Sequence, residues 1–121
     1  MNVLIVYAHR EPESFNAAMK ELAVSVLTEQ GHEVKVSDLY AMKFKPVAGR
    51  DDFEPVSTAS HINYMLEQRE NAKKDSFSRD IKEEQERVKW AALVIFQFPI
   101  WWFSVPAILK GPQLEWLGTL A

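Results

Sequence analysis

The sequence predicts a doubly wound α/β domain built on a parallel sheet, and three observations indicate it. Residues 3–7 form a continuous run of apolar, mostly β-branched side chains, and residues 93–98 are almost as apolar. Strands of this kind lie inside parallel sheets, where helices cover both faces. The first run is followed by a segment of helical periodicity and then by a strand-like segment, which together make a βαβ unit. The length of 121 residues is that of one domain.

The first helix is expected after the short polar segment that follows the first strand. Apolar side chains recur there at helical spacing, with Lys20, Glu21 and Glu29 off the stripe: Phe15, Met19, Leu22, Ala23, Val26 and Leu27. Ser14 is a suitable N-cap for this helix, and Gly31 is a suitable C-terminal stop. Alternation of apolar and polar residues from Val34 to Leu39 then predicts the second strand.

The middle of the chain, residues 40–77, has weaker patterns. Prolines, glycine and aspartates indicate an irregular connection, and residues 61–74 are compatible with a mostly polar helix. Long connections of this kind are uncommon unless they serve a site, so a flap, a subunit contact and a plain surface insertion all stay open. A helix rich in Glu and Lys follows, with Ser78 as its N-cap and Asp80 in its first turn. It leads to the third strand, residues 93–98.

The pattern ends after three strands, whereas a doubly wound sheet has about five or six. The third strand would therefore lie at an edge, although its composition is that of an interior strand, and such an edge invites pairing with another chain. A further helix begins near Pro106 but is interrupted by Gly111 and Pro112. We expect residues 1–111 to be the first part of a domain truncated after its third strand, and residues 112–121 to be a divergent tail.

Composition and charge exclude several functional classes. Without cysteine there is no disulfide, thiol nucleophile or zinc–thiolate site. A net charge of -3 argues against a protein that binds nucleic acid by charge. The longest apolar stretch, residues 90–109, is interrupted by Gln97, Pro99 and Pro106, so we expect no membrane span, and the absence of a targeting segment favours a cytoplasmic location. No metal site is expected, since His61 lacks a partner at metal-ligand spacing.

Ligands of open α/β sheets bind beyond the carboxyl ends of the strands, and residues 8–16 occupy that position after the first strand. They lead into a helix N-terminus, where backbone N–H groups and the helix dipole favour a phosphate. His9, Ser14 and Asn16 could each donate to phosphate oxygens. The glycine-rich patterns of ordinary dinucleotide folds and P-loops do not occur, and a lone histidine after a strand is more often structural than a ligand.

Residues 96–103 hold five of the 14 aromatic side chains of the sequence. Pro99 ends the third strand and leaves three of them on the following loop: Trp101, Trp102 and Phe103. A planar ligand would gain about 0.5–1.5 kcal/mol per stacked ring pair beyond simple burial. A cover over the core and a dimer contact are equally compatible with these residues.

Together, these segments resemble those of the NAD(P)H–quinone oxidoreductases, a family of flavoproteins with a flavodoxin-like fold. Four stretches carry the resemblance, which covers most of the chain: residues 3–9, 14–16, 37–42 and 93–111. The last stretch is the most specific, because Phe-Gln-Phe-Pro followed closely by Trp-Phe-Ser-Val-Pro-Ala-Ile-Leu-Lys-Gly is not a generic pattern.

The resemblance implies a homodimeric, cytoplasmic enzyme that binds FAD at two sites along its dimer interface. It implies that hydride passes from NAD(P)H through FAD to a quinone, which is reduced by two electrons. By resemblance, three residues hold the FAD phosphates: His9, Phe15 and Asn16. By resemblance, Asn63 stands at a further polar position that contacts the cofactor.

The resemblance also places the isoalloxazine ring against four residues: Ile100, Trp101, Trp102 and Phe103. Two of them, Trp102 and Phe103, would in addition line the substrate pocket that nicotinamide and quinone use in turn. The Tyr/His pair with which the family stabilises reduced flavin belongs to the part of its fold beyond the position of Gly111. We therefore expect no catalytic residue in this chain, and impaired activity from it alone.

Two other functions stay open at this point. One is an FMN-dependent NADPH reductase or regulatory flavoprotein, which has the same fold and loosely similar segments. The other is a non-catalytic truncated isoform that pairs with a full-length subunit through its third strand and its aromatic loop. Co-purification with a full-length partner and without flavin would distinguish this last function from the other two.

Overall fold

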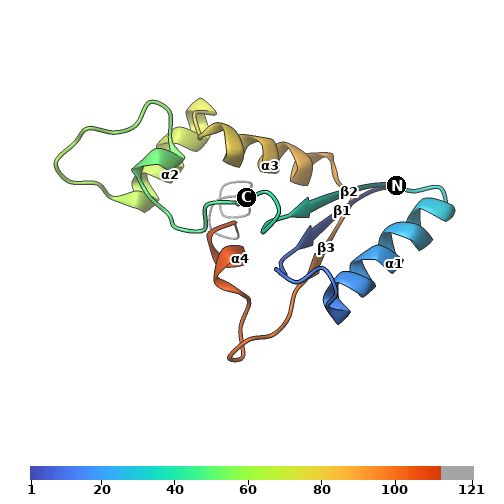
Figure 1. Ribbon diagram of the computed structural model, residues 1–121. Coiled ribbons are helices and arrows are strands. Elements are labelled where there is room, and N and C mark those ends of the chain that lie inside the picture. Colours follow the sequence, from blue (N-terminus) through green and yellow to red (C-terminus); the bar gives the residue numbers. More distant parts are fainter. Residues whose placement is uncertain (113–121) are drawn as a thin grey trace.

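The computed structural model describes residues 1–112, which form a three-stranded parallel sheet with helices on both faces (Figure 1). The strands are β1 (Asn2–Tyr7), β2 (Glu33–Asp38) and β3 (Leu93–Gln97), in the spatial order β2-β1-β3. The helices are α1 (Phe15–Glu29), α2 (Tyr64–Lys74), α3 (Arg79–Trp90) and α4 (Ala107–Pro112), with a short 3-10 helix, η1, at Arg50–Asp52. The predicted α/β class is confirmed, although β3 ends one residue earlier than expected.

β1 is the central strand, and its side chains are the best covered in the sheet. From Val3 to Tyr7, none is more than 2% exposed. Both neighbouring strands run parallel to β1, so that Ile5 lies between Val36 of β2 and Ile95 of β3. The apolar run at residues 3–7 is therefore the interior strand that its composition predicts, and β3 lies at an edge as expected.

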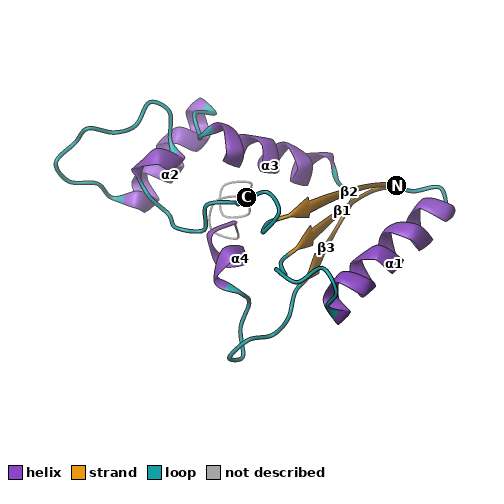
Figure 2. Ribbon diagram, viewed as in Figure 1, coloured by secondary structure: helices purple, strands orange, loops and turns teal. Residues whose placement is uncertain are grey.

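Alternate residues of β1 point to opposite faces of the sheet, and each face meets a different helix (Figure 2). Leu4 and Val6 pack in one buried cluster with Ile81 of α3. Tyr7 points to the other face, where Lys20 of α1 lies over its ring with the ammonium 4.7 Å from the ring centroid. The connections from β1 to β2 and from β2 to β3 thus cover opposite faces, which is the doubly wound arrangement.

α1 begins and ends where the sequence predicts, but much of its apolar stripe is not buried. Ser14 Oγ accepts a hydrogen bond from the Ala17 N–H (3.1 Å), and Gly31 adopts a left-handed φ of +87° after the helix. Ala17 is the buried residue of this helix, whereas Leu22, on the stripe, is 64% exposed. The side chain of Lys20, off the stripe, is only 16% exposed. The helix therefore packs on the sheet with residues such as Ala17 and Lys20, which lie beside the apolar stripe and not on it.

α3 begins directly after Ser78, at the predicted position. The Ser78 hydroxyl, however, donates to the Asp80 carboxylate (2.6 Å) and makes no capping bond with the backbone of the first turn. The start of the helix is thus confirmed and the predicted hydroxyl cap is wrong. A nearby carboxylate is the stronger partner, because a hydrogen bond to an ionised group is stronger than one between neutral groups.

A buried polar group connects α3 to β2. The Glu84 carboxylate accepts a hydrogen bond from the Ser37 hydroxyl (2.6 Å) and forms an ion pair with Arg87 (3.1 Å). Burial raises the pKa of Glu84 above its ordinary value, and the hydrogen bond from Ser37 and the charge of Arg87 offset only part of that effect. The β2 edge is therefore joined to α3 by polar contacts.

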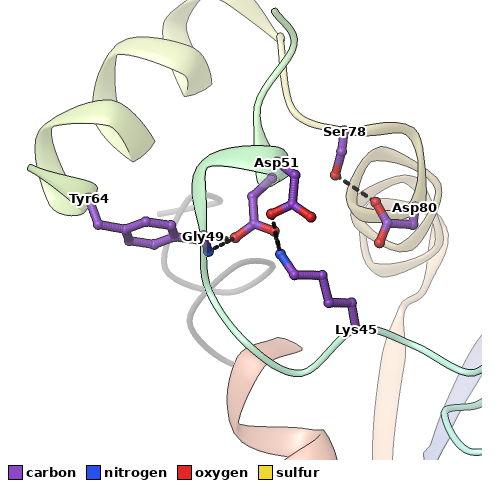
Figure 3. Close-up of polar contacts among 7 residues, drawn as sticks. Lys45, Gly49, Asp51, Tyr64, Ser78 and Asp80 are labelled. Atoms are coloured by element: carbon purple, nitrogen blue, oxygen red, sulfur yellow. Dashed lines mark hydrogen bonds and ion pairs between the residues drawn. The ribbon is translucent and has the colours of Figure 1, made fainter. Parts of the chain in front are cut away.

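The segment between β2 and α3 is organised around the buried carboxylate of Asp52. Figure 3 shows Lys45, Gly49 and Tyr64, which contact this carboxylate. Lys45 donates to Asp51 (2.5 Å) and to Asp52 (2.9 Å), while the Gly49 N–H (2.9 Å) and the Tyr64 hydroxyl (2.7 Å) donate to the other Asp52 oxygen. Partial burial lowers the pKa of Lys45, but the hydrogen bonds to the two carboxylates outweigh it and hold that pKa above its ordinary value. This network joins η1 to α2.

Aromatic side chains bury the base of the same segment. Phe53 and Phe77 form an isolated antiparallel bridge, with their ring centroids 5.6 Å apart, and the Tyr64 ring packs 5.4 Å from that of Phe53. The polar helix expected at residues 61–74 is confirmed with a later start, at Tyr64, because Asn63 is its N-cap.

α4 packs against the loop that follows β2. Gly111 is buried, and a Cβ added there would lie 2.2 Å from the carbonyl oxygen of Pro46. Leu109, in the same helix, is fully buried in the core. The helix runs through Gly111 to Pro112, so the glycine serves a close approach inside it. The rest of the tail expected at residues 112–121 lies outside the described residues.

Candidate cofactor site

Two loops meet beyond the carboxyl ends of the adjacent strands β1 and β3. The first leads from β1 into α1 and the second leads from β3 into α4. The rings of His9 and Trp101 join them, packed edge to face with centroids 5.8 Å apart. The Gln97 amide also donates to the Asn16 side-chain oxygen (2.7 Å), which links the end of β3 to the start of α1. Open α/β sheets bind ligands beyond the carboxyl ends of their strands, which is where these two loops lie.

The first loop presents hydrogen-bond donors. His9 Nδ1 accepts from the Glu11 N–H (3.0 Å), so a neutral imidazole carries its proton on Nε2. The Asn16 oxygen is engaged by Gln97, which leaves the amide NH2 group of Asn16 as the donor. The first turn of α1 adds backbone N–H groups without partners inside the helix. A set of donors at a helix N-terminus fits the phosphates of a cofactor.

The second loop contains a tight turn with two bulky residues in the left-handed region. Trp101 and Ser104 pair across it through two backbone hydrogen bonds (3.0 and 3.1 Å). Between them, Trp102 and Phe103 have φ values of +50° and +61° and are 94% and 98% exposed. Left-handed backbone costs about 1–3 kcal/mol for a residue other than glycine. Two features of this turn are therefore unfavourable: the left-handed backbone of two bulky residues, and the exposure of their aromatic rings to solvent.

The sequence contains no signal for this turn. Turns with two left-handed residues usually carry Asn-Gly or Asp-Gly, and here the two positions are aromatic. Gln97 was likewise missed as a site residue, although a polar side chain at the end of an apolar strand is a sign of a role beyond that strand. Its hydrogen bond to Asn16 shows that role.

Seven of the eight predicted cofactor residues lie on these two loops or on the first turn of α1: His9, Phe15, Asn16, Ile100, Trp101, Trp102 and Phe103. The eighth, Asn63, accepts a hydrogen bond from the Leu66 N–H (3.2 Å) at the start of α2. It lines a separate shallow hollow of about 360 Å³ with Met65 and Arg69. Figure 1 shows α2 well away from the loop between β3 and α4. Within one chain, Asn63 is not brought to the other residues.

A larger hollow, of about 470 Å³, lies on the β2 side of the first loop. Its charged lining pairs opposite signs, since Arg10 and Lys20 accompany Glu21 and Asp38, and Lys20 is 2.9 Å from Glu21. His9 of the first loop lines it, but none of the exposed aromatic residues of the turn does. Size alone therefore does not locate the candidate site, which is defined by the donors of the first loop and the turn after β3.

Two kinds of feature are absent from residues 1–112. No group of three or more His, Asp or Glu side chains in this range could hold a metal ion. Within the same residues, no helix is both long and apolar enough to cross a membrane.

Comparison with known proteins places the chain in a family. A family model described as a flavodoxin-like fold matches residues 1–111. The chain belongs to the flavodoxin-like fold family. The expectation of this fold from the sequence is therefore confirmed.

Named relatives of this flavodoxin-like chain act on quinones. It is 54% identical over 110 residues to a ribosyldihydronicotinamide dehydrogenase (quinone) from Rattus norvegicus, covering 90% of this chain and 48% of the relative. It is 50% identical over 109 residues to an NAD(P)H dehydrogenase (quinone) from Cavia porcellus, covering 89% and 40%. A solved structure from Klebsiella pneumoniae, assigned as a quinone reductase, matches 95% of this chain and 44% of its own with a TM-score of 0.90 and 45% identity. The chain spans about half the length of these relatives.

Proposed function

We propose that this chain is the first half of a flavin-dependent quinone reductase, which transfers hydride from NAD(P)H through FAD to a quinone. The names of its relatives support the substrates, because they combine a quinone with a nicotinamide donor. The flavodoxin-like family supports a flavin as the cofactor. The resemblance of the sequence at His9, Asn16 and the aromatic loop supports FAD in particular.

The turn after β3 is the observation that carries this proposal. Two left-handed aromatic residues, almost fully exposed, are unfavourable unless a flat ligand covers them. Trp101, at the start of the same turn, packs against His9, whose loop leads to a helix N-terminus that fits phosphates. A flavin nucleotide has both parts, a planar ring and a phosphate chain.

Each part of the site would have a distinct task. When bound, the flavin accepts a hydride from the nicotinamide and delivers it to the quinone. Trp102 and Phe103 would orient the ring system and exclude water from one side of it. His9 and Asn16 would hold the phosphates with their Nε2–H and NH2 groups. Reduction of a quinone by hydride also consumes one proton, and residues 100–103 have no ionisable side chain to donate it.

Binding is tested by titrating the chain with FAD, FMN and riboflavin while tryptophan emission is recorded. We expect FAD to quench the emission most strongly, with a dissociation constant of up to about 1 mM, or about 4 kcal/mol, because the turn is open to solvent. In Trp102→Gly the quenching should be lost while the chain becomes no less stable to heat, since glycine removes the left-handed strain.

Trp90 offers a matched control at the other end of the sheet. Its carbonyl accepts a hydrogen bond from Asn2, at the start of β1, and Lys35 lies 4.1 Å from its ring centroid. Trp90→Phe should leave the quenching by FAD unchanged. Equal quenching in Trp102→Gly, or none by any flavin at about 1 mM, would overturn the proposed site. Stronger quenching by FMN than by FAD would favour the FMN-dependent alternative.

Activity is tested with the same chain, FAD, NADPH and a simple benzoquinone. We expect slow turnover, because the turn that would hold the ring is exposed on its outer side. Rapid turnover would contradict the expected impairment while supporting the reaction itself.

We also propose a homodimer in the cytoplasm, with Asn63 acting across the subunit interface. The separation of Asn63 from the other site residues within one chain supports such a contribution from a second subunit. Gel filtration with and without FAD tests it. A monomer at all concentrations would leave Asn63 no route to the cofactor and would remove it from the site.

A further inference from the structure

The hollow on the β2 side of the first loop is not used by the proposed function. Its volume of about 470 Å³ is in the range of sites for small ligands, which is about 300–1,000 Å³. All of its lining residues belong to one βαβ unit: the end of β1, the first loop, the first half of α1 and the segment after β2. His9 is the one residue that it shares with the candidate cofactor site.

Tyr7, at the end of β1, lines this hollow and carries a buried polar group without a partner. The residue is 2% exposed, and its hydroxyl makes no hydrogen bond with any of residues 1–112. Buried hydroxyl groups in proteins are normally hydrogen-bonded, because an unpaired one costs free energy. A polar group of a ligand in the hollow would remove that cost.

Asp38 lies next to Tyr7 on the same face of the sheet. The two residues are partners in the register of β1 and β2, so both side chains point to the α1 face. One carboxylate oxygen of Asp38 accepts a hydrogen bond from the Ala41 N–H (3.2 Å). The carboxylate forms no ion pair within the described part of the chain. Its charge is therefore available to a cationic group in the hollow.

The two basic side chains of the lining differ in their partners. Lys20 lies over the Tyr7 ring and forms an ion pair with Glu21 (2.9 Å), so its charge is balanced. Arg10 is exposed and has no ion-pair partner among residues 1–112. Arg10 and Asp38 thus offer one unbalanced charge of each sign to the same hollow, and they do not pair with each other.

This charge pattern favours a ligand that carries both signs. A simple anion would meet two carboxylates in the hollow and a simple cation would meet two basic groups, and like charges brought together are unfavourable. A zwitterion can place each of its charges beside the opposite one. The lining also has an apolar part, to which three small residues contribute: Pro12, Ala17 and Ala41.

We propose that this hollow is a second binding site, which takes a free α-amino acid with an apolar side chain. Asp38 accepts hydrogen bonds from its ammonium group. Arg10 holds its carboxylate, a group that the guanidinium can bind with two parallel hydrogen bonds, and the Tyr7 hydroxyl donates to the same group. Because that hydroxyl is buried, the flexible side chain of Lys20 over the ring moves aside when the ligand enters. The site stands independently of the function proposed above.

The test uses L-leucine as the probe and records the amide signals of the chain by NMR. We expect the Ala41 N–H signal to shift, because that group donates to Asp38, with a dissociation constant of about 1–10 mM for so small a ligand. Isocaproate, which is leucine without its ammonium group, and isopentylamine, which is leucine without its carboxylate, should each bind at least tenfold more weakly.

Two variants test the residues of the site. Asp38→Asn keeps an oxygen for the Ala41 N–H and should weaken leucine binding at least tenfold. Tyr7→Phe should weaken it by about tenfold without lowering the thermal midpoint, since the hydroxyl has no partner to lose. Glu13→Gln is the matched control, because Glu13 is an exposed carboxylate of the first loop outside the hollow, and it should bind leucine normally.

The outcomes separate this site from the candidate cofactor site. Leucine binding should persist in Trp102→Gly, and its persistence there together with a failure of all flavins to bind would count against the proposed function alone. The second site is refuted by the absence of any shift at about 100 mM leucine, or by isocaproate binding as tightly as leucine. It is also refuted if Asp38→Asn or Tyr7→Phe binds leucine as well as the unchanged chain does.

Discussion

β2 and β3 are both edge strands of one sheet, but only β2 has the side chains of an edge. Glu33 and Lys35 of β2 are charged and exposed, and charged residues keep other strands from pairing with an edge. β3 has no charged residue from Leu93 to Gln97, and its first side chain is 43% exposed. The comparison shows that two edge strands of one sheet can differ in composition. The uncharged side chains of β3 are typical of a strand inside a sheet, whereas the charged ones of β2 are typical of an edge.

The largest expected effect is on the free energy of unfolding, and it concerns Ile5 of the central strand β1, which lies between the two edge strands. Ile5→Ala should lower the free energy of unfolding by about 2–5 kcal/mol, because Ile5 is almost completely buried. Ile95→Ala, at the partly exposed position beside it on β3, should cost less than half as much. Urea unfolding of the two variants measures the difference.

Val36→Ala provides the matched substitution on β2, since Val36 pairs with Ile5 from the other side. Equal costs for Ile5→Ala and Ile95→Ala in the chain alone would mean that β3 is already covered.

A smaller effect is expected where the loop after β2 meets the helix after β3. Gly111→Ala places a Cβ 2.2 Å from the Pro46 carbonyl oxygen, so backbone must move. The expected loss is about 1–3 kcal/mol, as for other overpacked sites. Lys110→Ala, at the exposed neighbouring position, should change the thermal midpoint little. An unchanged midpoint in Gly111→Ala would show that α4 is not held against this loop.

The smallest expected effect concerns the polar contact between β2 and α3. Because burial raises the pKa of Glu84, the folded chain binds that proton more tightly than the unfolded chain, whose carboxyl has the ordinary value of 4.5. Stability from this group is therefore full below about pH 4.5 and is lost as pH rises through the higher folded pKa. Glu84→Gln removes this dependence.

The measurement compares thermal midpoints of the chain and of Glu84→Gln between acid and neutral pH. The stability of the unchanged chain relative to the variant should fall as the pH rises from acid to neutral. Glu86→Gln, at an exposed carboxylate of the same helix, should follow the unchanged chain. A difference between Glu84→Gln and the unchanged chain that does not vary with pH would contradict the raised pKa.

Much of the framework follows from local patterns in the sequence. The apolar runs of β1 and β3, the Ser14 cap and the Gly31 stop each depend on a few neighbouring residues, so they could be predicted. The Asp52 network could not, because its partners, from Lys45 to Tyr64, come together only when the segment folds. Likewise, helical spacing identifies the apolar side of α1, but it does not say that this side is exposed.

The candidate site divides in the same way. The aromatic side chains after β3 are visible in the sequence, as is the polar loop after β1. Their contact through His9 and Trp101 depends on β1 and β3 being neighbours, which is a property of the whole sheet. The left-handed backbone at Trp102 and Phe103 has no local signal, since neither residue type favours it.

The exposed apolar side chains of α1 have a consequence for this chain in solution. Phe15, Met19, Leu22 and Val26 are all exposed on this one helix. Exposed apolar patches promote association between molecules. Because salts such as sulfate strengthen the burial of apolar surface, we expect them to promote association of this chain.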